Sequence, residues 1–61
     1  MDDIELITSQ LEDIAERLND VAMSIISEAI ENGETSRPPI EKRVSQARRA
    51  VEKAVQHLKH D

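Results

Sequence analysis

The sequence predicts an all-α protein: an antiparallel two-helix hairpin that pairs with a second copy into a homodimeric four-helix bundle. Apolar residues recur in strict 3,4 alternation over residues 4–25 and again over residues 40–58, the pattern of amphipathic helices. Gly33 and the pair Pro38-Pro39 lie between the two runs and rule out one continuous helix. The first apolar run consists of Ile4, Ile7, Leu11, Ile14, Leu18, Val21 and Ile25, and the second of Ile40, Val44, Ala47, Val51, Ala54 and Leu58.

The first helix is expected over residues 3–31. Asp2 is a suitable N-cap, because its carboxylate can accept a hydrogen bond from a free amide of the first turn. With Ile4 counted as heptad position a, three e positions hold alanine: Ala15, Ala22 and Ala29. Small side chains beside the apolar run let a neighbouring helix come close, which is typical of helix bundles.

The connection is expected over residues 32–38 and the second helix over residues 39–59, all within one domain, 1–61. Gly33 suits the left-handed position that follows a helix, and Pro39 suits a first helical turn, where no amide donor is needed. A loop of this length is ordinary between antiparallel helices.

Self-association is expected from two apolar surfaces that one hairpin leaves uncovered. The first helix is longer than the second, which would cover it only to about Leu11 and leave the first turns in water. The residues that we expect in an interface with a second copy or a partner protein are Ile4, Ile7, Leu11, Met23, Ile26 and Ile30. A symmetric dimer would bury both surfaces at once.

Composition supports the same conclusion. The chain has 61 residues, no cysteine and no aromatic residue, so neither a disulfide nor large core side chains can stabilise a domain of this marginal size. The net charge of −5 is divided unevenly. Residues 1–34 hold ten acids and one base, whereas residues 35–61 hold seven bases and three acids. An acidic helix beside a basic one favours pairing between them.

The residues needed for catalysis are missing, so we expect no enzyme, no metal and no cofactor. His57 and His60 are three residues apart in a terminal turn, but a solvated pair is a better account than a metal site. Gly33 is the sole glycine, so no phosphate-binding loop is present. The serines lie in no nucleophile motif.

The expected function is therefore that of a small non-catalytic interaction or adaptor protein. One alternative is a nucleic-acid-binding regulator that uses the basic face of the second helix, with Arg43, Arg48, Arg49 and Lys53 against phosphates. The acidic net charge and the lack of aromatic residues argue against it. A second alternative is an accessory subunit of a larger enzyme. The acidic N-terminus and the lack of a long apolar run favour a cytoplasmic protein without a membrane partner.

Two families have a similar layout. The expected dimer of hairpins resembles the Rop-like RNA-binding proteins, although the aromatic residue used by that family is missing here. The stretch from Leu11 to Leu18, LEDIAERL, is similar to part of the small subunit of exodeoxyribonuclease VII, whose second-helix aromatic and glycine signals are also missing. Neither resemblance transfers a site residue to this chain.

Overall fold

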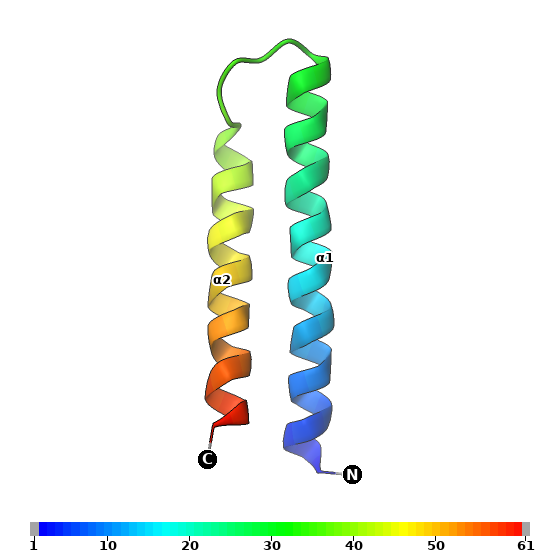
Figure 1. Cartoon of the computed structure of the whole chain (residues 1–61), viewed down its shortest axis with the longest axis vertical. Helices are drawn as coiled ribbons and strands as arrows, with labels where there is room; N and C mark the ends of the chain where they lie inside the picture. Colours follow the sequence, from blue (N-terminus) through cyan, green and yellow to red (C-terminus); the bar gives the residue numbers. More distant parts are fainter. Residues whose placement is uncertain (1, 61) are drawn as a thin grey trace.

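A computed structural model describes residues 2–60 of the chain and shows two antiparallel α-helices (Figure 1). Helix α1 spans Asp3–Glu31 and helix α2 spans Pro39–Lys59. No strand occurs within residues 2–60, so the predicted all-α helical hairpin is confirmed. Met1 and Asp61, which the expected domain includes, lie outside the described residues.

Local interactions fix both ends of α1. The Asp2 carboxylate accepts a hydrogen bond from the Ile4 amide at 3.0 Å, as expected of an N-cap. At the other end Gly33 has a φ of +77°, which an L-residue with a side chain avoids. This turn lets the Gly33 amide donate to the Ile30 carbonyl at 3.0 Å and the Glu34 amide donate to the Ala29 carbonyl at 2.9 Å. These two bonds form a Schellman motif, which satisfies carbonyls that the helix end would leave free.

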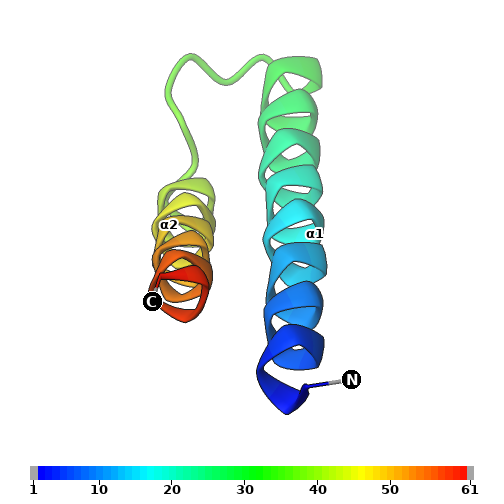
Figure 2. The same cartoon turned by 60° about the horizontal axis from the view of Figure 1, so that its bottom comes forward.

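The connection over residues 32–38 arches away from α1 and then descends beside it before α2 begins at Pro39 (Figures 1 and 2). An extended residue advances the chain by about 3.3 Å, against about 1.5 Å in a helix. The loop therefore makes up for the shorter second helix. Lys59 Nζ lies 2.8 Å from Glu12 Oε2, and Leu58 borders the same hollow as Ile4. The expectation that α2 covers α1 only to about Leu11 is wrong for this reason.

The two helices meet along a narrow line of residues spaced seven apart, which we call the contact stripe. Its members are Thr8, Ala15, Ala22 and Ala29 on α1 and Glu41, Arg48 and Val55 on α2. The four residues of α1 are 5–7% exposed. Two hollows give the antiparallel register: Leu58 shares one with Ile4 and Thr8 near the start of α1, and Pro38 shares another with Ile26 and Ala29 near its end. Val55 consequently lies close in height to Thr8, Arg48 to Ala15 and Glu41 to Ala22 (Figure 1).

The 3,4 apolar runs lie beside the contact stripe rather than on it. Leu11, Leu18 and Ile25, at heptad position a, are half-buried, whereas Ile14 and Val21, at position d, are 41% and 48% exposed. The alanines occupy the closest approach because they have the shortest side chains. The hairpin is a thin layer, with extents of 48 × 16 × 11 Å, and has no enclosed core.

Candidate interaction surface

The larger side chains of both runs gather on one side of the hairpin, which we call the apolar face. With Ile40 counted as heptad position d, the contact stripe of α2 falls at position e, as it does on α1. Each helix therefore turns position e toward the other helix and leaves positions a and d beside this contact. Two antiparallel helices that meet in this way are related by an approximate twofold axis perpendicular to their common plane, so their a and d positions lie on the same side. The exposed members of the apolar face are Ile4, Ile7, Ile14 and Val21 of α1 and Ile40 and Leu58 of α2, which are 38–51% exposed.

The exposed area is large for a chain of this size. Residues of the hairpin expose 4985 Å² in total, whereas a compact monomer of 6.9 kDa exposes about 4000 Å². The excess is about 1000 Å². A stable protein–protein interface of standard size buries about 800 Å² on each partner. One partner on the apolar face would therefore bring the exposed area to the ordinary range.

The six interface residues expected from the sequence fall on two separate surfaces. Ile4 and Ile7 belong to the apolar face, and Leu11 is half-buried at its inner edge. The other three, Met23, Ile26 and Ile30, form what we call the loop-end patch, on the opposite side of α1. Met23 is 61% and Ile30 is 68% exposed, and Ile26 borders a small hollow with Pro38 of the loop.

Four residues of the apolar face were not among those expected in the interface: Ile14, Val21, Ile40 and Leu58. They belong to the 3,4 apolar runs, which lie beside the contact between the two helices rather than in it. The signal that identifies them is the heptad phase: every seventh residue starting from Thr8 is small along α1, so position e takes the contact and position d is left outside.

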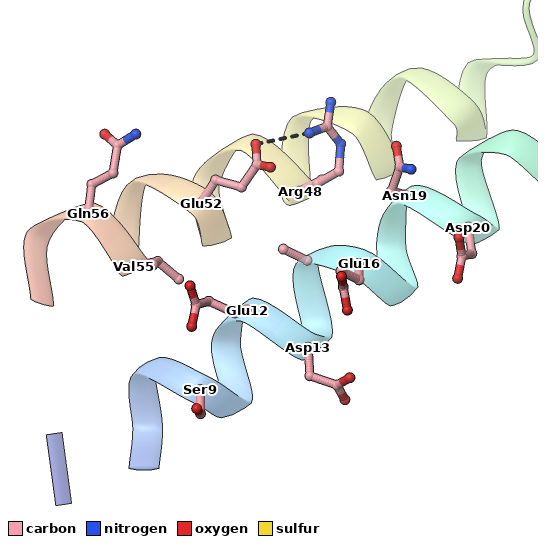
Figure 3. Close-up of a pocket in the computed structure, with 11 residues that line it drawn as sticks. Ser9, Glu12, Asp13, Glu16, Asn19, Asp20, Arg48, Glu52, Val55 and Gln56 are labelled. Atoms are coloured by element: carbon pink, nitrogen blue, oxygen red, sulfur yellow. Dashed lines mark hydrogen bonds and ion pairs between the residues drawn. The ribbon is translucent and has the colours of Figure 1, made fainter. Parts of the chain in front are cut away.

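A polar groove runs along the side opposite the apolar face (Figure 3). The close-up shows acidic side chains of α1 along one wall and the Arg48–Glu52 ion pair on the other. Its charged and polar lining consists of Ser9, Glu12, Asp13, Glu16, Asn19 and Asp20 of α1 and Arg48, Glu52 and Gln56 of α2. Among residues 2–60, no three His, Asp or Glu side chains are placed to hold a metal ion.

Glu41 is a buried carboxylate that sequence reasoning missed. It is 1% exposed and lies on the contact stripe. Its Oε1 accepts hydrogen bonds from Arg37 Nη2 at 2.6 Å and from the Ser45 hydroxyl at 2.7 Å. The bond from Arg37, followed by that from Ser45, holds the pKa of Glu41 below its ordinary value, although burial opposes this shift. The heptad spacing from Glu41 through Arg48 to Val55 could have placed it there.

The four basic residues proposed for nucleic-acid contact do not share one surface. Arg43, Arg49 and Lys53 are exposed on the side of α2 that faces away from α1. Arg48 instead lies on the contact stripe, where its side chain is 27% exposed and pairs with Glu52 at 2.9 Å. Its Nε is buried without a hydrogen-bond partner in the described part of the chain. Arg48 is therefore directed toward α1 rather than toward the outer basic surface.

Comparisons with known proteins give no relative. The chain matches no protein-family model, and searches of characterised proteins and of solved structures find no match. Within residues 2–60, neither helix combines the length and the apolarity required to cross a membrane.

Proposed function

We propose that this chain is a small non-catalytic interaction protein that self-associates through its apolar face. The observation that carries the proposal is the row of half-exposed apolar side chains at every heptad d position from Ile7 to Val21, continued by Ile40 on α2. Monomeric proteins rarely expose contiguous apolar patches of this kind.

The free energy gained by covering the apolar face supports the same proposal. Fully burying an isoleucine, leucine or valine side chain stabilises by about 1.5–3 kcal/mol, so covering one that is half exposed contributes about 1 kcal/mol. Two copies bring at least twelve such side chains into contact. The sum is comparable with the association cost of about 4–15 kcal/mol. A dimer whose affinity depends strongly on each of these residues is the expected result.

The test is the solution mass by light scattering, with helicity measured by circular dichroism at the same concentration. We expect the wild-type chain, with a subunit mass of 6.9 kDa, to be a helical dimer. Ile14→Asp, in the middle of the apolar face, should give a monomer. Met23→Asp is the matched control, because Met23 is also apolar and exposed but lies in the loop-end patch.

The control variant should keep the wild-type mass. A fully helical wild-type monomer would contradict the proposal. So would an Ile14→Asp variant with unchanged mass and helicity.

The loop-end patch and the outer basic surface stay uncovered in such a dimer. They support two further roles, as contacts for a larger protein and for nucleic acid respectively. Arg43, Arg49 and Lys53 carry the second role. If they contact phosphates, RNA or DNA binding should weaken with salt and with Arg49→Glu, but not with Arg48→Met. Equal effects of the two substitutions would contradict a contact through the outer surface.

A further inference from the structure

We propose that a hollow at the loop end of α2 binds a compact phosphate group, either the free ion or the phosphate ester of a small molecule. The hollow has a volume of about 540 Å³, within the range of about 300–1,000 Å³ that is typical of small-molecule sites. Its charged side chains, those of Arg37, Lys42 and Arg49, are all positive. We call it the basic hollow.

The spacing of its residues explains why they meet. Lys42, Gln46 and Arg49 follow one another at intervals of four and three along α2, so they lie on one face of the helix. Arg37 approaches this face from the loop, because its Nη2 atom donates a hydrogen bond at 2.6 Å to Oε1 of Glu41 in the first turn of α2. Three cations and one amide group therefore converge on one hollow.

Arg37 is held in position while other donors of its guanidinium stay exposed. The bond to Glu41 engages one guanidinium nitrogen, and the Arg37 side chain is 68% exposed. A guanidinium can bind an oxyanion through two parallel hydrogen bonds. The Glu41 carboxylate thus orients a donor that suits a phosphate group.

The two other cations have no carboxylate of their own. Lys42 and Arg49 are exposed, and neither forms an ion pair within residues 2–60. The pKa of Glu41 is lowered mainly by the hydrogen bonds from Arg37 and Ser45, and the positive charge of Arg49 adds to this effect. Both arginines are therefore near the same carboxylate, and the cations of the hollow outnumber it.

Side chains rather than backbone amides supply the donors. Pro39 has no amide N–H, and the Glu41 amide donates to the Pro38 carbonyl at 3.0 Å. The two prolines instead give the hollow an apolar part, against which the carbon skeleton of a phosphate ester can pack.

Neighbouring acids favour a small ligand over a nucleic-acid strand. Lys42 and Arg49 share heptad position f with Gln56 of the polar groove, so the basic hollow and this groove lie on the same side of the hairpin. A polyanion that continued along this side would meet the carboxylates of Glu16 and Asp20 and be repelled. The hollow also lies away from the apolar face, so the inference does not depend on self-association.

The experiment is a titration of the full chain, followed through its amide resonances by NMR at an ionic strength held constant with sodium chloride. Inorganic phosphate and adenosine monophosphate are the two probes. Both should give saturable shifts at the amides of residues 40–49. Tighter binding of inorganic phosphate would identify the free ion as the ligand, and tighter binding of the nucleotide would identify an ester; either supports the site.

Charge-removing variants test which residues bind. Lys42→Gln and Arg49→Gln should each raise the dissociation constant of both probes by about three- to fivefold. Arg43→Gln is the matched control, because Arg43 is exposed and adjacent to Lys42 but does not line the hollow; its effect should stay below about twofold at physiological ionic strength. Arg37 is left unchanged, because its removal would deprive buried Glu41 of its cationic partner and alter stability.

Three results would overturn the proposal. Equal weakening by Arg43→Gln and Lys42→Gln would show that binding follows total charge rather than the hollow. Shifts that do not saturate at millimolar concentrations of either probe would show that no site exists. Tighter binding of a short single-stranded DNA, weakened by Arg43→Gln, would assign the basic residues to nucleic-acid contact on the outer surface instead. Light scattering on the same samples reports self-association separately, so a monomer that binds phosphate would refute the dimer and support the site.

Discussion

Enlarging one alanine of the contact stripe should separate the two helices. Ala15 is 7% exposed and lies on the contact stripe close to Arg48 of α2, with which it lines the polar groove. The close-up shows Val55 directed toward α1 across the polar groove (Figure 3). Ala15→Leu inserts three more carbon atoms at this closest approach. Overpacking of this kind costs about 1–3 kcal/mol.

This cost is a large part of the total. At about 0.05–0.15 kcal/mol per residue, a chain of 61 residues is stable by about 3–9 kcal/mol. The loss should be measured from urea unfolding followed by circular dichroism. With a slope near 1 kcal/mol per molar urea, the midpoint should fall by about 1 M or more. Several protein concentrations are needed, because dimerisation makes the midpoint concentration-dependent.

Glu16→Leu provides the matched control for this prediction. It introduces the same side chain one residue further along α1, at an exposed position, where substitutions change stability by about 0.5 kcal/mol or less. The reasoning is refuted if Ala15→Leu is as stable as Glu16→Leu. That result would mean that α1 and α2 do not approach closely at Ala15.

Two further predictions concern the loop and the buried carboxylate. Gly33→Ala should destabilise by about 1–2 kcal/mol through backbone strain alone, since φ is +77° and an added Cβ meets no atom within 4 Å; in the same urea assay, an unchanged midpoint would contradict the left-handed turn. The pKa of Glu41 lies below its ordinary value of 4.5, chiefly through the hydrogen bond from Arg37. Its ionised form therefore stabilises the fold above pH 4.5, and this contribution is lost as the pH falls through the lowered pKa. The urea midpoint of the wild type should therefore exceed that of Glu41→Gln at pH 7, and the difference should shrink below pH 4.5; a difference independent of pH would show that the charge of Glu41 is not responsible.

The sequence was sufficient to predict the hairpin because its signals are local. Asp2, Gly33 and Pro39 each act within one helical turn, and their cap, turn and first-turn roles all appear in the structure. The repeated 3,4 spacing similarly predicts an amphipathic helix without knowledge of the partner. These features depend on residues that are neighbours in the chain.

The side of each helix that turns inward was harder to predict. The structure places Thr8 and three alanines between the two helices and leaves Ile14 and Val21, which belong to the apolar run of α1, exposed. Apolar periodicity identifies the solvent-exposed side of a helix. It cannot tell which of two apolar sides packs against the neighbouring helix. The alanine repeat was visible, yet its consequence for the larger residues depends on how close the axes come, which is a tertiary property.

Arg48 illustrates the same limit at the candidate site. Its type and its neighbour Arg49 suggested a common basic face, but adjacent residues on a helix point about 100° apart. Heptad phase places Arg48 on the contact stripe with Glu41 and Val55, and the structure shows it half-buried against Glu52. Charge identity alone could not distinguish an outward residue from one between the helices.

The close packing of the hairpin and the exposure of its apolar face both follow from the small residues of the contact stripe. A line of small residues between α1 and α2 allows a close approach, and it leaves no room there for isoleucine, leucine or valine. Those side chains must then lie beside the contact, where two helices of an 11 Å thick layer cannot cover them. A hairpin packed in this way therefore leaves its larger apolar side chains half exposed, and this exposure is the reason for the proposed second layer.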